Sequence, residues 1–267
     1  MNHESETHDY QILTGFYRNG ENVSDEQLHR EYLRRTERLI DDVVETRPDF
    51  LIFLDKSARP VSWLVEGMWE SVARGVKKPQ IQFLNIDREQ WRDTVGSNAT
   101  YIDADRIDQN RINELHALFA LKPVRDNREG VVRHSVADEP TILDDKKVMI
   151  IDEVRATGDT LDMAKAILRR AFPKTEFIGK HWMIPQTKSV AGGGTANAEV
   201  PVWYHSDSVF GRGVNNRDTI SSARSDNRTQ RIGRWFLSTR FDMPDPKSEQ
   251  LRKEMTWLAE DYKKTRP

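Results

Sequence analysis

The chain has no cysteine among its 267 residues. Disulfide bonds, thiolate catalysis and cysteine-based zinc sites are therefore excluded. No apolar run approaches the roughly 20 residues needed to cross a bilayer, so we expect no membrane partner. Residues 1–6 are acidic and lack the charged-then-apolar order of a signal peptide. Together, these absences predict a cytoplasmic protein.

The chain also has little net charge, because 41 Lys and Arg residues face 43 Asp and Glu residues. No global field attracts nucleic acid, which we do not expect as a partner. Five arginines between residues 224 and 240 form a local basic stretch, and such a stretch is more often a solvated face. The seven histidines show no metal-ligand spacing, so no protein-built zinc site is expected.

Hydrophobic residues still make up 37% of the chain, and there are seven tryptophans, which is enough to form a core. Short apolar runs predict buried strands, which are 50–54, 81–86, 147–151, 176–184 and 200–204. Apolar residues at helical spacing predict helices, which are 25–46, 60–74, 111–121, 161–172 and 249–263. This alternation predicts an α/β fold with a mostly parallel sheet flanked by helices.

Composition divides the chain into three parts. Residues 1–23 are polar and without period, which predicts a loosely held N-terminal arm. Residues 24–204 carry the alternating strands and helices of the core. Residues 205–267 are basic and mixed, and we expect them to form an extension that need not be a separate domain.

The most informative segment is 148–161, where an apolar strand ends in Asp152 and Glu153 and a Thr-Gly-x-Thr sequence then leads into a helix. Ligands of open α/β sheets bind at the carboxyl ends of strands. Carboxylates accept hydrogen bonds from sugar hydroxyls. Small residues around Gly158 and the helix N-terminus can hold a phosphate. The alternative is that the two acids only end a strand and cap a turn.

This segment resembles the phosphoribosyl pyrophosphate motif of the type I phosphoribosyltransferases. The resemblance implies that family's Rossmann-type core with a less regular hood. It also implies that Asp152 and Glu153 are the catalytic acids, which hold the ribose hydroxyls. The 5-phosphate loop that it implies consists of Arg155, Ala156, Thr157, Gly158, Asp159 and Thr160.

Members of the family bind pyrophosphate in a loop after an early strand, and 55–60 occupies that place here. Lys56 and Arg59 could neutralise a diphosphate, and Ser57 could donate a hydrogen bond to it. The alternative is a solvated charged turn. The family also carries a loop that closes over the site, for which 88–110 and 123–137 are candidates.

The resemblance implies an acceptor pocket in the hood, where Trp203 and Tyr204 could stack on a base. The alternative assigns both residues to the core, and His181 is likewise more often a core histidine than a catalyst. The implied cofactor is Mg²⁺, which would be held by oxygens of the ligand near Asp152 and Glu153, with no ion site built by the protein alone.

The favoured hypothesis is a phosphoribosyltransferase that transfers the phosphoribosyl group from phosphoribosyl pyrophosphate to an unidentified acceptor. A hydrolase of related compounds belongs to the same class. Ala156 stands where some purine enzymes of the family carry an aspartate, so the motif offers no general base. The alternative is a non-catalytic sensor of the same fold. A phosphoribosyl pyrophosphate synthase is a third hypothesis, which lacks a visible ATP-binding segment. A homodimer is a candidate assembly.

Overall fold

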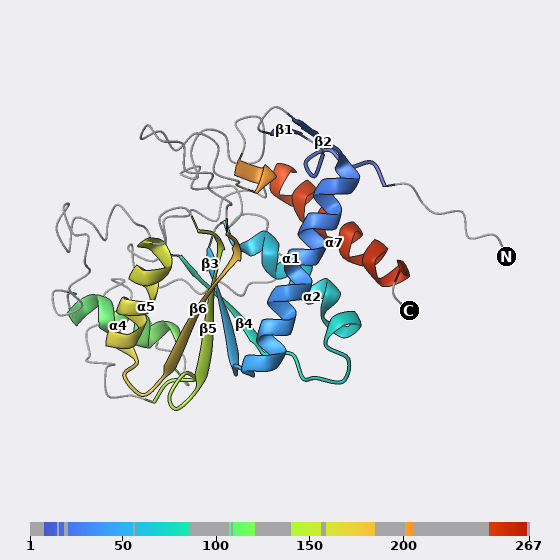
Figure 1. Ribbon diagram of the computed structural model, residues 1–267. Helices are drawn as coiled ribbons and strands as arrows, with labels where there is room; N and C mark the ends of the chain where they lie inside the picture. The colour runs from blue at the N-terminus through green and yellow to red at the C-terminus, as the bar shows by residue number, and fades with distance from the viewer. Residues whose placement is uncertain are drawn as a thin grey trace, which may run out of the picture.

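The computed structural model describes residues 8–14, 16–18, 21–55, 57–85, 107, 109–120, 140–155, 159–184, 201–204 and 246–265. These residues form an α/β fold, in which a four-stranded sheet is flanked by helices (Figure 1). The predicted fold class is therefore confirmed. No helix in these described ranges is both long and apolar enough to span a membrane.

The sheet has the strand order β4-β3-β5-β6, and all its strand pairs are parallel. The strands are β3 (Phe50–Asp55), β4 (Gln80–Asn85), β5 (Lys147–Val154) and β6 (Glu176–Met183). β5 lies between β3 and β6, and its residues from 148 to 154 are all buried. Because the strands are parallel, their carboxyl ends meet at one edge of the sheet.

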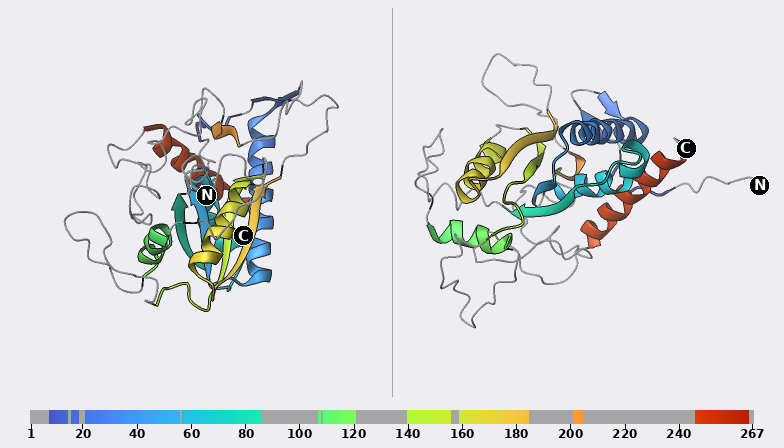
Figure 2. Two further views of the ribbon diagram at one scale, coloured as in Figure 1. Left: turned by 90° about the vertical axis from the view of Figure 1, so that its left-hand side faces the viewer. Right: turned by 90° about the horizontal axis from the view of Figure 1, so that it is seen from below.

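Helices cover both faces of the sheet (Figure 2). Helices α1 (Asp25–Thr46) and α2 (Arg59–Val72) share one apolar core with α7 (Pro246–Thr265). Helices α4 (Gln109–Leu118) and α5 (Asp159–Ala171) form the core on the opposite face. Strand residues alternate between these two cores, as the period of two along a strand requires.

The predicted helix over 25–46 coincides with α1, and its capping box is present. The Ser24 hydroxyl accepts a hydrogen bond from the Gln27 N–H at 3.3 Å, and the Ser24 N–H donates to the Gln27 side chain at 2.9 Å. The predicted strands at 50–54, 81–86, 147–151 and 176–184 are the four strands of the sheet, with ends that differ by up to three residues.

The predicted strand at 200–204 is wrong, because residues Val202–Tyr204 form a 3₁₀ turn, η2. Trp203 has no exposed surface, and its ring lies 5.6 Å from that of Tyr32 and 5.8 Å from that of Trp182. The Tyr32 hydroxyl accepts a hydrogen bond from the Val202 N–H at 2.7 Å. The turn is therefore held by side chains of other elements, and its Val202 N–H has a hydrogen-bond partner without a neighbouring strand.

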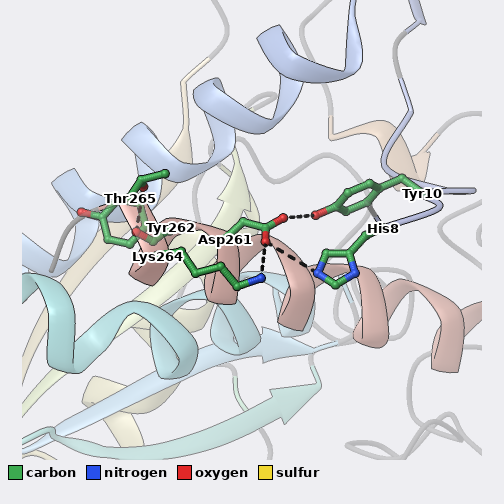
Figure 3. Close-up of polar contacts among 6 residues, drawn as sticks. All are labelled: His8, Tyr10, Asp261, Tyr262, Lys264 and Thr265. Atoms are coloured by element: carbon green, nitrogen blue, oxygen red, sulfur yellow. Dashed lines mark hydrogen bonds and ion pairs between the residues drawn. The ribbon is translucent and has the colours of Figure 1, made fainter. Parts of the chain in front are cut away.

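The N-terminal segment 8–14 is packed, contrary to the expectation of a loosely held arm. The Glu254 carboxylate of α7 accepts hydrogen bonds from the N–H groups of residues 11–13, the shortest of which is 2.7 Å, from Leu13. Figure 3 shows Asp261 on the same helix, where it accepts a hydrogen bond from the Tyr10 hydroxyl at 3.3 Å and lies 3.6 Å from His8. Segment 16–23 then forms a short antiparallel pair, β1 (Phe16–Arg18) and β2 (Glu21–Val23).

The burial of one glutamate of α7 explains why this contact was missed. Glu254 is fully buried, although a glutamate on a helix is normally exposed. Its partners are backbone N–H groups, which carry no side-chain signal in the sequence. The last helix therefore ties the first described residues to the body of the fold.

Replacement of Glu254 by glutamine tests this tie. One oxygen remains as an acceptor, but the new amide places its own N–H groups against backbone donors. We expect Glu254→Gln to lower the free energy of unfolding by about 1–3 kcal/mol in urea denaturation, because buried donors lose their partner. Glu249→Gln, at an exposed position of the same helix, is the control and should be neutral. Equal urea midpoints for both variants would contradict the assignment.

A close approach of α2 and α7 permits a second test. A Cβ atom added to Gly67 would lie 2.5 Å from the Cβ of Ala259. In a helix interior, Gly→Ala alone stabilises by about 1 kcal/mol, whereas overpacking costs about 1–3 kcal/mol. We therefore expect Gly67→Ala to lower the thermal midpoint, and Ala259→Gly to restore part of it in the double variant. A higher midpoint for Gly67→Ala alone would contradict the packing.

Candidate functional site

The carboxyl end of β5 delivers Asp152 and Glu153 to the edge where β3 and β6 also end. Both acids are buried, with 6% of Asp152 and 3% of Glu153 exposed. The Glu153 N–H donates a hydrogen bond to Oδ1 of Asp152 at 3.1 Å. Acids at a strand end are normally solvated, and burial of two adjacent carboxyls carries a large desolvation cost.

Ser57 joins the two predicted halves of the site. It follows β3 in the predicted pyrophosphate loop, and its side chain lies near enough to the Glu153 carboxyl to lower the pKa of that group. β3 and β5 are neighbours in the sheet, so the turn after β3 starts beside the end of β5. The structure thus places a residue of the predicted diphosphate loop against one of the predicted ribose acids.

His181, which the sequence analysis favoured as a core histidine, lies beside the acids. It pairs with Asp152 in the register of β5 and β6, and its Nε2 lies 4.0 Å from Oδ2 of Asp152. Its side chain is 13% exposed. A histidine in an apolar strand has no sequence signal that identifies its neighbour. Only the register of two strands, which are separated by α5, brings these residues together.

Burial determines the protonation of this cluster. It raises the pKa of Glu153 well above its ordinary value, and the negative charge of Asp152 raises it further. Burial also raises the pKa of Asp152, while a hydrogen bond from Glu153 and the nearby His181 oppose that rise. We therefore expect the pair to carry one proton near neutral pH, with that proton on Glu153. Burial lowers the pKa of His181, so its imidazole is expected to be neutral.

The predicted 5-phosphate loop is described only at its two ends. Arg155 is exposed just after β5, and its N–H donates to the carbonyl of Met183 at 2.9 Å. The other end is the first turn of α5, where Asp159 begins the helix and Thr160 is half-buried. The three remaining loop residues, 156–158, lie outside the described part of the chain. The loop is therefore followed directly by a helix N-terminus, as the phosphate hypothesis requires.

The three residues predicted to bind the diphosphate lie in different places. Ser57 contacts Glu153, and Lys56 lies outside the described residues. Arg59 is fully buried in the first turn of α2, and its guanidinium carbon lies 4.1 Å from the centre of the Phe83 ring. The structure places this side chain in the core of the fold, so the alternative of a solvated charged turn does not describe Arg59. Its contact with a diphosphate stays a prediction.

The predicted acceptor residues are not brought to the acids by any described contact. Trp203 is a core residue between Tyr32 and Trp182, which agrees with the alternative given for it. The side chain of Tyr204 lies outside the described part of the structure. Most of the candidate closing loop 88–110, and all of 123–137, also lies outside the described residues.

No group of three or more His, Asp or Glu side chains that could hold a metal ion occurs within the described ranges. The Asp152–Glu153 pair alone offers too few ligands for a dedicated cage. Oε2 of Glu153 is nevertheless buried and has no hydrogen-bond partner among the residues that the structure describes. The Mg²⁺ ion that the sequence analysis expects, held by oxygens of a bound molecule near this pair, therefore stays a prediction.

Comparisons with known proteins add little to this geometry. No protein-family profile and no curated protein sequence matches the chain. One solved structure to which it is similar is a purine phosphoribosyltransferase from Pyrococcus horikoshii Ot3, at 15% sequence identity. The match covers 60% of this chain and 77% of that one, with a TM-score of 0.31. A TM-score this low carries no argument about the present chain.

The raised pKa of Glu153 predicts how stability depends on pH. A group that binds its proton more tightly in the folded state stabilises the fold at low pH, and this contribution is lost as the pH rises through its folded pKa. We expect Glu153→Gln, which cannot ionise, to gain stability relative to the parent protein between about pH 5 and about pH 8. Urea denaturation at both pH values measures the difference.

Glu70→Gln is the matched control, because Glu70 is exposed on α2. Its stability relative to the parent protein should be the same at both pH values. A constant difference for Glu153→Gln as well would show that Glu153 is ionised in the folded state throughout this range, contrary to the expected proton on the pair.

Proposed function

We propose that the chain is a phosphoribosyltransferase, which binds phosphoribosyl pyrophosphate with Mg²⁺ and transfers the phosphoribosyl group to a base or another nucleophile. Pyrophosphate is the product that leaves. One observation carries this proposal: the contact of Ser57 with Glu153 joins the turn after β3 to the acids that end β5. Two loops with different predicted ligands, a diphosphate and a ribose phosphate, thus share one sheet edge.

Each part of the proposed substrate has a chemical counterpart at this edge. The two carboxyls suit the ribose hydroxyls, since ionised carboxylates accept hydrogen bonds strongly. The 5-phosphate suits the segment before α5, whose N-terminus supplies N–H groups and partial positive charge. The diphosphate suits the predicted loop 55–60, which leads into the first turn of α2.

The transfer itself would be a substitution at C1 of the ribose. The acceptor forms a bond to C1, the bond from C1 to the pyrophosphate oxygen breaks, and the pyrophosphate keeps the electron pair. Positive charge develops on the sugar ring, as in glycoside cleavage. Asp152 and Glu153 would fix the ring by its hydroxyls and place negative charge near it. Mg²⁺ on the ligand oxygens would supply charge neutralisation for the leaving diphosphate.

Pyrophosphate release tests the proposal. The protein is mixed with phosphoribosyl pyrophosphate, Mg²⁺ and a panel of bases, and pyrophosphate is measured. We expect Asp152→Asn to lower the rate by about 100-fold or more, because a positioned charge is lost. Asp41→Asn, at an exposed position of α1, is the control and should retain the parent rate.

Two other results would replace the proposal. Tight binding of phosphoribosyl pyrophosphate without turnover on any acceptor would favour a sensor of the same fold. If Gly158→Val left the affinity for phosphoribosyl pyrophosphate unchanged, the assignment of the 5-phosphate loop would be wrong, because a branched side chain there must obstruct the approach of the phosphate.

A further inference from the structure

His181 presents a nitrogen to the acid pair without binding it. Its Nε2 is buried, lies 4.0 Å from Oδ2 of Asp152, and has no hydrogen-bond partner within the described residues. A buried polar atom without a partner costs free energy, commonly about 1–3 kcal/mol, and needs an explanation. A small movement of either side chain would bring the two atoms into hydrogen-bond range.

The acid pair poses a problem of charge that this nitrogen can solve. Glu153 and Asp152 are adjacent and buried, so both can be ionised only when something compensates for the second negative charge. Ribose hydroxyls that donate to both acids favour the doubly ionised form. Hydroxyls are neutral, however, and leave the additional negative charge in place.

Four charged groups act on the His181 imidazole from the elements around it. They are Asp152 of β5, Arg155 just after β5, and Asp162 and Lys165 of α5. Lys165 and Asp162 form an ion pair with each other at 3.7 Å. Arg155 is exposed, and its charge is largely screened by solvent. Among these groups, the half-buried His181 is therefore the one beside the pair whose imidazole can accept a proton.

We propose that His181 is a positioning residue, which takes up a proton when a ribose phosphate binds, so that Asp152 and Glu153 both become carboxylates. This inference rests on the proposed function. Before binding, the proton is on Glu153 and the imidazole is neutral. After binding, Glu153 has lost the proton and Nε2 of His181 carries one. The cluster has a net charge of minus one in both states, so no proton is exchanged with solvent.

Histidine titration by NMR in the full-length protein tests this directly. The ring signal of His181, identified by its loss in His181→Gln, is followed with pH in the absence and presence of ribose 5-phosphate. We expect a neutral imidazole near neutral pH without the ligand and a protonated one with it. Saturating ligand that leaves the His181 titration unchanged would overturn the proposal.

Calorimetry provides a second readout that a merely structural role would not change. The number of protons released on binding follows from the heat measured in buffers of different ionisation enthalpy. We expect about zero for the parent protein and about one for His181→Gln, because the Glu153 proton then has no acceptor within the protein. The dissociation constant of that variant should therefore fall about tenfold per pH unit near neutrality.

His116→Gln is the matched control, because His116 is buried but bonds to the carbonyl of Ala171, at the C-terminal end of α5. This variant should show the proton count and the affinity of the parent protein. The same proton count for His181→Gln and the parent protein would overturn the role of His181 alone. Absence of binding of both ribose 5-phosphate and phosphoribosyl pyrophosphate with Mg²⁺ to the parent protein would overturn the proposed function and this role together.

Discussion

The parallel pairing of β5 with β3 on one side and β6 on the other is the constraint from which the site follows. It covers both edges of β5 while the helices cover both its faces, so residues 148–154 are all buried, including the acids near its end. Asp152 and Glu153 occupy that end. Their burial raises the pKa of both, and hydrogen bonds alone cannot remove the cost. Two neighbours oppose this rise in pKa, Ser57 just after β3 and His181 of β6.

The helices on one face are linked to both ends of the described chain. Ser57 lies two residues before α2, and α2 packs closely against α7 at the contact of Gly67 and Ala259. α7 is in turn bound to the N-terminal segment through Glu254. The N-terminal segment, α7 and α2 therefore form one continuous series of contacts.

The sequence predicted the features that depend on local pattern. The period of apolar residues located α1 and the four sheet strands. The order of strand, acids, Thr-Gly-x-Thr and helix identified the candidate site. Each of these features is encoded within about twenty residues of sequence, where the periods of helix and strand decide.

The features that were missed depend on contacts between distant segments. His181 meets Asp152 only through strand register, and Glu254 binds backbone N–H groups some 240 residues away. Trp203 lies in a turn because the Tyr32 hydroxyl satisfies its neighbour's backbone, which no pattern around residue 200 reveals. Arg59 was expected on a loop, but its guanidinium lies over Phe83 of β4. In each case, a side chain from another element overrides the local preference.

The environment of the acids also bears on the alternative that they only end a strand and cap a turn. A capping acid is stabilised by solvent and by backbone N–H groups of the next turn. Asp152 accepts a hydrogen bond from the Glu153 N–H, and Ser57 lies close to the Glu153 carboxyl, yet Oε2 of Glu153 is buried without a partner in the described structure. Replacement of buried charged groups by apolar residues of similar volume is often neutral or stabilising. A carboxyl kept at such a cost is easier to explain by a ligand that donates to it than by a structural cap, because a solvated acid would cap the turn equally well.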